Sequence, residues 1–222
     1  MHVGMIVGIG PAATDFYYRT IITIAEARGA TLDLTMAHAD LPTLRRNLGA
    51  ADTQAQAAVY LRLTEGLKAA GAEAVAITSI AGHFCLDAFR AVSPLPVISI
   101  LTEVNNAVKA AGHRRLGIIG NNIPMRTRFY GALPGTEVLA PEGEMQAQVH
   151  TAYMDMASRG AVTEAERDIF LQAGHALMAQ GAEAIMLGGT DLALAFPGGQ
   201  APFPLLDCAG IHAAAIARAA LD

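Results

Sequence analysis

The feature that most constrains the fold is a regular alternation of short apolar runs with longer alanine-rich stretches. The apolar runs have the length of strands, and the stretches between them carry apolar residues at helical spacing. Parallel strands that are covered by helices on both faces have continuously apolar sequences of this kind. The chain is therefore predicted to be an α/β protein with parallel sheets.

This pattern locates the individual elements. The clearest strands are expected at residues 3–7, 32–36, 74–78, 96–100, 116–119, 184–187 and 203–206. The clearest helices are expected at residues 12–28, 53–70, 103–111, 144–158, 163–179 and 209–220.

Segments of the first half recur in the second half at a nearly constant offset. Residues 71–77 (GAEAVAI) return as residues 181–187 (GAEAIML), an offset of 181 − 71 = 110. Residues 5–8 are echoed by 117–120 at an offset of 112, and residues 16–17 by 129–130 at 113. Alanine-rich units can look alike by chance, but three echoes favour two pseudo-symmetric Rossmann-like domains. We expect a first domain of residues 1–99 plus 205–222 and a second domain of residues 100–204.

The candidate binding region follows from this organisation. In open parallel sheets, ligands bind beyond the carboxyl ends of the strands. Glycine and small polar residues follow four expected strands, at residues 8–11, 78–79, 120–122 and 188–190. Two facing domains would present these loops to one interdomain cleft, with Ser79 and Gly189 as equivalent positions.

Composition excludes several classes of protein. The 222 residues are 53% hydrophobic and 16% charged, which is too apolar for a disordered chain and leaves a lightly charged surface that suits a homodimer or higher homo-oligomer. The net charge of −5 argues against a nucleic-acid partner. No apolar run is long enough to span a membrane, and no basic segment precedes a signal-like stretch, so a cytoplasmic protein is expected. Cys85 and Cys208 lack disulfide-framework or metal-ligand spacing, so no metal site is predicted.

Five segments, taken in order, resemble motifs of the aspartate/glutamate racemase family and span nearly the whole chain. They are GIGPAATDFYY (residues 8–18), HADLPTLRR (38–46), TSIAGH (78–83), GGTD (188–191) and LDCAGIH (206–212). The resemblance implies two α/β domains with a cleft between them, a dimer and no cofactor. It also implies carbon-acid chemistry next to the carboxylate of a small amino or dicarboxylic acid.

The chain departs from this family at the positions that carry its chemistry. Family members use two opposed cysteines as base and acid, and here Ser79 and Gly189 stand at those positions. Ile80 replaces an asparagine, and Gln148 aligns with a lysine that contacts the distal carboxylate. A serine hydroxyl is a weak base unless a neighbour activates it, and glycine cannot exchange a proton. Each missing acid–base group typically costs a factor of about 10²–10⁴ in rate, so racemisation by two thiols is not expected.

The catalytic candidates are Ser79, His83 and Cys208. His83 lies one helical turn after Ser79, where it could activate the hydroxyl, and Cys208 could replace a missing acid or base. Each has a structural alternative: Ser79 as a helix cap, His83 as a packing residue and Cys208 as a small buried hydrophobic residue.

The substrate-binding candidates are backbone amides and polar side chains at the strand ends. Glycine-rich turns before helices can offer N–H groups to a carboxylate, and arginine can bind it through two hydrogen bonds. His38, Asp40 and Arg45 are expected on the loop after the second strand. Thr14, Asn121 and Asn122 could equally be helix caps. The complete set is Gly8, Gly10, Pro11, Thr14, Arg45, Thr78, Ile80, Asn121, Asn122, Gln148, Gly188, Gly189 and Thr190.

Three functions remain open at this point. The favoured one is a cofactor-independent enzyme of the isomerase, lyase or decarboxylase type that acts on a small carboxylate substrate. The alternatives are an amino-acid racemase that uses substitute bases and a non-catalytic protein that binds carboxylates.

Overall fold

The computed structural model describes residues 1–222 and contains two four-stranded parallel sheets, which confirms the predicted α/β class. The chain divides into two compact units. Unit 1 comprises Met1–Glu103 and Gly210–Asp222, and unit 2 comprises Val104–Ala209. None of the helices is both long enough and apolar enough to cross a membrane.

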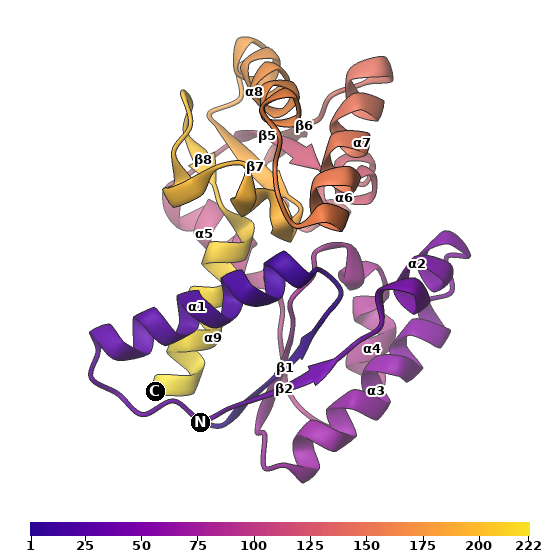
Figure 1. The fold of residues 1–222 in the computed structure, drawn as a ribbon, viewed down its shortest axis with the longest axis vertical. Helices are drawn as coiled ribbons and strands as arrows, with labels where there is room; N and C mark the ends of the chain where they lie inside the picture. Colours follow the sequence, from indigo (N-terminus) through magenta and orange to yellow (C-terminus); the bar gives the residue numbers. More distant parts are fainter. The chain divides into compact units, whose positions relative to one another are not determined.

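Unit 1 is built on a sheet with the strand order β2-β1-β3-β4. Its strands are β1 (Val3–Val7), β2 (Leu34–His38), β3 (Ala74–Ile77) and β4 (Val97–Ile98). Figure 1 shows α1 (Pro11–Ala27) and α9 (Cys208–Leu221) on one side of this sheet, and α3 (Thr53–Ala69) and α4 (Leu86–Val92) on the other. Helix α2 (Leu41–Gly49) packs beside α3. Because helices cover both faces, β1 and β3 are buried along their whole length.

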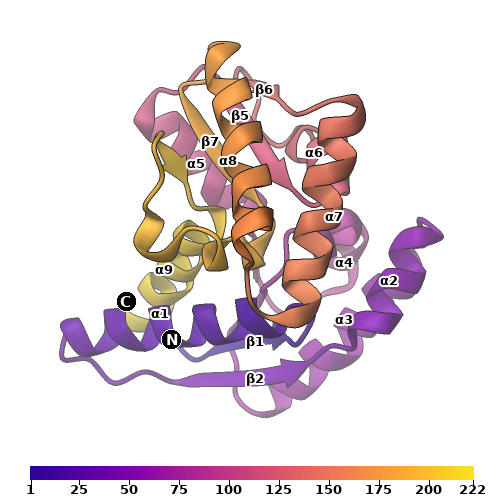
Figure 2. The ribbon, with the colours of Figure 1, turned by 45° about the horizontal axis from the view of Figure 1, so that its top comes forward.

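Unit 2 repeats this topology with the strand order β6-β5-β7-β8. Its strands are β5 (Arg115–Gly120), β6 (Glu137–Leu139), β7 (Ala184–Gly188) and β8 (Leu205–Leu206). Helices α7 (Gly143–Arg159) and α8 (Glu164–Ala179) lie side by side next to the sheet (Figure 2). The remaining helices are α5 (Ile100–Ala111) and the short α6 (Asn122–Arg126).

Both sheets use a glycine in the central strand to bring a helix close. A Cβ atom on Gly4 of β1 would lie 3.0 Å from Leu67 Cδ1 of α3, and a Cβ atom on Gly117 of β5 would lie 3.0 Å from Leu177 Cβ of α8. The strand pairings place Val3 beside Ala74 and Leu116 beside Ala184, so the first strands are offset by 116 − 3 = 113 residues. Leu67 and Leu177 are offset by 110 residues, as are the first residues of β3 and β7.

The turn at the repeated Gly-Ala-Glu sequence has the same geometry in both units. Gly71 and Gly181 have φ values of +100° and +92°, a region that side chains disfavour. The N–H of Glu73 donates to His2 O, and that of Glu183 donates to Arg115 O, both at 2.8 Å. The echo at residues 71–77 and 181–187 therefore marks equivalent structure. The echo of Phe16-Tyr17 does not, because these residues lie in α1 whereas Phe129 and Tyr130 form a 3₁₀ turn.

Four short elements were missed by the sequence pattern, which detects only long periodic segments: strand β6 and helices α2, α4 and α6. The strands expected at 96–100 and 203–206 are present as β4 and β8, but each covers only two residues. The predicted loop after the second strand is also wrong. His38 is the last residue of β2, Asp40 caps α2 by accepting a hydrogen bond from Thr43 N, and Arg45 lies within α2.

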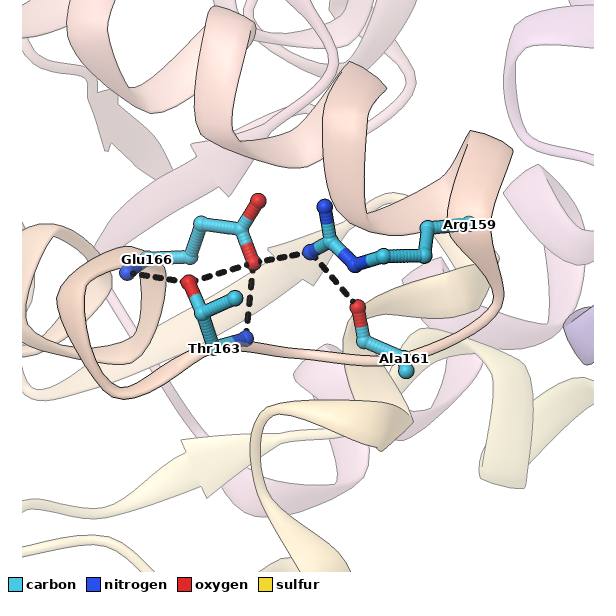
Figure 3. A network of polar contacts seen from close by, with 4 residues as sticks. All are labelled: Arg159, Ala161, Thr163 and Glu166. Carbon is cyan, nitrogen blue, oxygen red and sulfur yellow. Dashed lines mark hydrogen bonds and ion pairs between the residues drawn. The ribbon is translucent and has the colours of Figure 1, made fainter.

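Helix α8 begins with a reciprocal cap that Figure 3 shows. Thr163 Oγ1 accepts from Glu166 N, while Glu166 Oε2 accepts from Thr163 N, Thr163 Oγ1 and Arg159. The partial burial of Glu166 raises its carboxyl pKa, but the hydrogen bonds from Arg159 and Thr163 outweigh this and leave the pKa below its usual value. The cap therefore fixes the connection between α7 and α8.

Thr163→Ala should lower the free energy of unfolding by about 1 kcal/mol, because it removes the hydroxyl that caps α8. Urea unfolding followed by far-UV circular dichroism measures this change. Thr23→Ala, on the exposed face of α1, is the control and should have little effect. Equal effects of the two substitutions would contradict a specific stabilising role for the cap.

Candidate functional site

The loop after β1 is stabilised by Thr14 in the first turns of α1. Thr14 Oγ1 accepts a hydrogen bond from Gly8 N and donates one to Gly10 O, both at 3.0 Å. The Gly8 amide is therefore occupied within the loop, contrary to its predicted role as a donor to the substrate. No side chain caps the N-terminus of α1, which starts at Pro11 and has no acidic residue in its first turn. This end of α1 keeps the positive potential that attracts an anion.

His38 lies against the same loop from the neighbouring strand. Gly8 has φ = +91°, and a Cβ atom there would overlap the His38 ring atoms Nδ1 and Cε1. Glycine at this position thus serves both the backbone conformation and the close approach of an exposed imidazole.

The end of β3 lies next to the end of β1. Thr78 N and Thr78 Oγ1 both donate to Ile6 O at 3.1 Å, so Thr78 holds the two strands together and its hydroxyl is used internally. Ser79 follows, with its Oγ accepting a hydrogen bond from Gly82 N at 3.1 Å. Ser79 therefore holds the second residue of the 3₁₀ turn Ala81–Cys85, and the hydroxyl proton is not consumed by this bond.

His83 does not contact the Ser79 hydroxyl as expected. Its Nδ1 instead meets the Ser79 carbonyl oxygen at 2.6 Å. Since a carbonyl can only accept, Nδ1 carries the proton and Nε2 has a lone pair. Nε2 is buried and has no hydrogen-bond partner. Burial, more than any other influence, lowers the His83 pKa to about 4.

His212 supports the His83 ring from α9. The two rings meet edge to face with centroids 6.3 Å apart. His212 Nε2 lies 2.9 Å from Ile98 O and Nδ1 lies 2.9 Å from Tyr17 Oη, so the phenol donates to Nδ1 while Nε2–H donates to the carbonyl. Burial lowers the His212 pKa to about 3. Both imidazoles are therefore neutral at pH 7.

Neither cysteine has the surroundings of a catalytic thiol. Cys208 is fully buried, and burial followed by the charge of Asp207 raises its pKa well above the usual value. Burial also raises the pKa of Cys85, to about 12. Both thiols stay protonated at neutral pH, so the geometry favours the structural alternative for Cys208.

The end of β5 in unit 2 carries Asn121 and Asn122. Asn121 Oδ1 caps α6 by accepting from Ile123 N at 3.0 Å. The Asn122 backbone amide donates to His150 Nδ1 of α7 at 3.1 Å. His150 is partly buried, and this burial lowers its pKa. Asn121 therefore has the structural role that was its alternative, and the Asn122 amide is occupied.

The end of β7 is covered by an aromatic ring. Gly188 ends the strand and Gly189 precedes the 3₁₀ turn Thr190–Leu194. A Cβ atom on Gly189 would collide with the Tyr153 ring and lie 2.9 Å from its Oη. Tyr153 Oη donates to Asp191 Oδ2 at 3.1 Å, and both side chains are buried.

The other predicted binding residues are either buried or exposed on helices. Ile80 and Thr190 are almost completely buried, at 1% and 4% exposure. Arg45 is exposed on α2, and the exposed Gln148 donates to Glu144 Oε1 one turn earlier in α7. Neither unit has a group of three or more His, Cys, Asp or Glu side chains that could hold a metal ion.

The comparisons with known proteins identify the family. The model of the family described as Asp/Glu/hydantoin racemase matches residues 6–216. The chain belongs to this family.

The fold is shared with solved members. An Asp/Glu racemase candidate from Yersinia pestis is 26% identical, with a TM-score of 0.87 and full coverage of both chains. An aspartate racemase homologue from Pyrococcus horikoshii OT3 is 22% identical, with a TM-score of 0.83 over 100% of this chain and 99% of that chain. A glutamate racemase from Francisella tularensis, solved with D-glutamate, is 14% identical, with a TM-score of 0.68 over 98% and 80% of the two chains.

Sequence reasoning missed the side chains that surround the strand ends of this Asp/Glu/hydantoin racemase family member. Tyr17, His150 and Tyr153 lie on helices; Tyr17 falls within the segment of residues 8–18 but was given no role, and the other two lie in no motif. His150 and Tyr153 are three residues apart on α7, the spacing that places two side chains on one helix face, and this was the available signal.

Unit 1 should lose stability as the pH falls from about 6.5 toward 4, because the unfolded chain takes up protons on His83 and His212 that the folded chain does not bind. Each residue contributes a slope of up to about 1.4 kcal/mol per pH unit. Urea midpoints measured between pH 5 and pH 7 should vary less in His212→Gln. His175→Gln, which removes an exposed histidine, is the control and should keep the wild-type slope. An unchanged slope in His212→Gln would contradict the neutral, buried state of this ring.

Proposed function

We propose that the protein is a cofactor-independent enzyme that makes or breaks a bond next to the carboxylate of a small amino or dicarboxylic acid. Membership of the Asp/Glu/hydantoin racemase family supports the substrate class, as does the D-glutamate bound by the Francisella tularensis relative. The reaction is of the isomerase, lyase or decarboxylase type.

The observation that carries this proposal is the arrangement at the carboxyl ends of β1 and β3. Ile6 O accepts two hydrogen bonds from Thr78, which brings the uncapped N-terminus of α1 and the Ser79 hydroxyl to the same edge of the sheet. A helix N-terminus stabilises a carboxylate, and a neighbouring hydroxyl can give or take a proton at the adjacent carbon.

Ser79 is the proposed proton-transfer group. Ser79 is buried, at 5% exposure, and because its Oγ accepts from Gly82 N, this bond leaves the hydroxyl proton free for a second partner. His83 cannot deprotonate it in this geometry, since Nδ1 faces the Ser79 carbonyl. Ser79 therefore acts as a donor, directly or through one water molecule. The bond from the substrate carbon to a leaving group such as carbon dioxide breaks and leaves its electron pair on carbon, the Ser79 proton moves to that carbon, and solvent water returns a proton to the Ser79 oxygen.

The proposed reaction is one-sided, in the sense that it uses a single proton-transfer group. Gly189, at the position equivalent to Ser79 in the repeat, has no side chain that could transfer a proton. A reaction with one proton-transfer group produces one stereoisomer, whereas racemisation needs groups on both faces of the carbon. Decarboxylation, elimination and one-sided isomerisation meet this condition.

The function can be tested by incubating the protein in deuterium oxide with a panel of amino and dicarboxylic acids and following the products by NMR and polarimetry. One-sided chemistry predicts deuterium incorporation or a new product without loss of optical rotation in the product. Racemisation of the acid itself, seen as loss of rotation with no change of covalent structure, would instead support a racemase with substitute bases. Silence across the panel would support carboxylate binding alone and contradict the proposal.

Ser79→Ala should lower the turnover of any acid found active by at least about 10²-fold, the usual contribution of one acid–base group. Binding of the same acid, measured by calorimetry, should change much less. Ser158→Ala, an exposed serine of α7, is the control and should keep wild-type turnover. Wild-type turnover in Ser79→Ala would remove this hydroxyl from the mechanism.

A further inference from the structure

The space that a side chain at residue 189 would fill is already occupied by another residue. The backbone of Gly189 is extended, with φ = −154° and ψ = 131°, so its conformation would accept any side chain. The obstacle is the Tyr153 ring, which a Cβ atom at 189 would overlap at Cε2 and Cζ. Glycine is therefore required here by packing and not by backbone strain.

The Tyr153 ring is held in place and cannot simply turn aside. It projects from α7 with 7% of its surface exposed, and its hydroxyl donates to Asp191 Oδ2 at 3.1 Å. Asp191 is itself 4% exposed, two residues after Gly189 in the chain. The Tyr153–Asp191 hydrogen bond thus joins α7 to the loop that contains residue 189.

We infer that Tyr153, held by Asp191, is a steric plug that fills the volume of a side chain at residue 189 and so prevents this strand end of unit 2 from supplying an acid–base group. The chemical meaning of the plug rests on the proposed function, whereas its steric part rests on the geometry of unit 2 alone. The plug makes this position a determinant of stereochemistry, because it excludes the second group that racemisation requires.

The electrostatic surroundings argue against a second role for Tyr153 as acid or base. Burial, together with the neighbouring Asp191 carboxylate, raises the phenol pKa well above 10. Phenolate formation would place two negative charges in contact within a desolvated region. The hydroxyl proton is engaged with Asp191, so the ring acts through its volume.

The steric part can be tested without any substrate. Gly189→Ala should lower the melting temperature by about 5 °C or more, because the new methyl group overlaps the ring. Gly66→Ala is the matched control, since a Cβ atom there meets no atom within 4 Å, and it should leave the melting temperature unchanged or raised.

A double-mutant cycle then assigns the clash to Tyr153. In a Tyr153→Ala background, Gly189→Ala should lower the melting temperature by less than half of its effect in the wild type. Should Tyr153→Ala fail to fold, Tyr153→Leu provides the background with a smaller cavity. Equal effects of Gly189→Ala with and without the ring would overturn the inference, whatever the enzyme's substrate is.

The functional part uses the acid identified in deuterium oxide. Tyr153→Phe keeps the ring and removes the hydroxyl, so the plug predicts a fall in solvent-proton exchange of less than about tenfold. A fall of 10²-fold or more would make the hydroxyl an acid or base and overturn the inference. If no acid is turned over by the wild type, the proposed function fails while the melting-temperature cycle still decides whether Tyr153 is a plug.

Discussion

The candidate site depends on the parallel pairing of two central strands within each sheet. Parallel strands in register end at the same edge, so the residues that follow them are brought together although they lie about 70 positions apart in the chain. In unit 1 the pair is β1 and β3, locked by the bonds from Thr78 to Ile6 O. In unit 2 it is β5 and β7, which stay paired as far as Gly120 and Gly188. The glycines that let Leu67 and Leu177 approach the sheets make this pairing compatible with tight helix packing.

Burial then decides the protonation states of the groups near these strand ends. His83, His212, Tyr153 and Cys208 are all buried, and in each of them desolvation is the largest influence on the pKa. Each is held neutral at pH 7, since a charged form would lose its hydration. Under the proposed function, such groups supply hydrogen bonds and shape, and proton transfer falls to the Ser79 hydroxyl. This is a different chemical strategy from a pair of ionisable thiols.

The fold was largely predictable, whereas the site was predictable only in part. Long periodic helices and apolar strands follow from local sequence, and the repeat at residues 71 and 181 correctly marked equivalent turns. The end of β1 was located correctly, and the ends of β3, β5 and β7 were located to within one residue. The roles of the residues at these ends were not predicted. A serine, asparagine or threonine after a strand looks the same in the sequence whether its side chain faces a ligand or hydrogen-bonds to its own backbone. Thr14, Asn121 and Ser79 all make backbone bonds that no motif distinguishes from substrate contacts.

By itself, the sequence determined the α/β class, the two similar halves and the absence of a thiol at positions 79 and 189, since these depend on residue type and periodicity alone. Only the tertiary structure decided which atoms are already paired and which volumes are filled. His83 turns its proton toward a backbone carbonyl, and Tyr153, 36 residues before Gly189 in the chain, occupies the space beside it. Such facts depend on how α7 packs against the end of β7, and contacts between distant segments leave no periodic trace in the sequence.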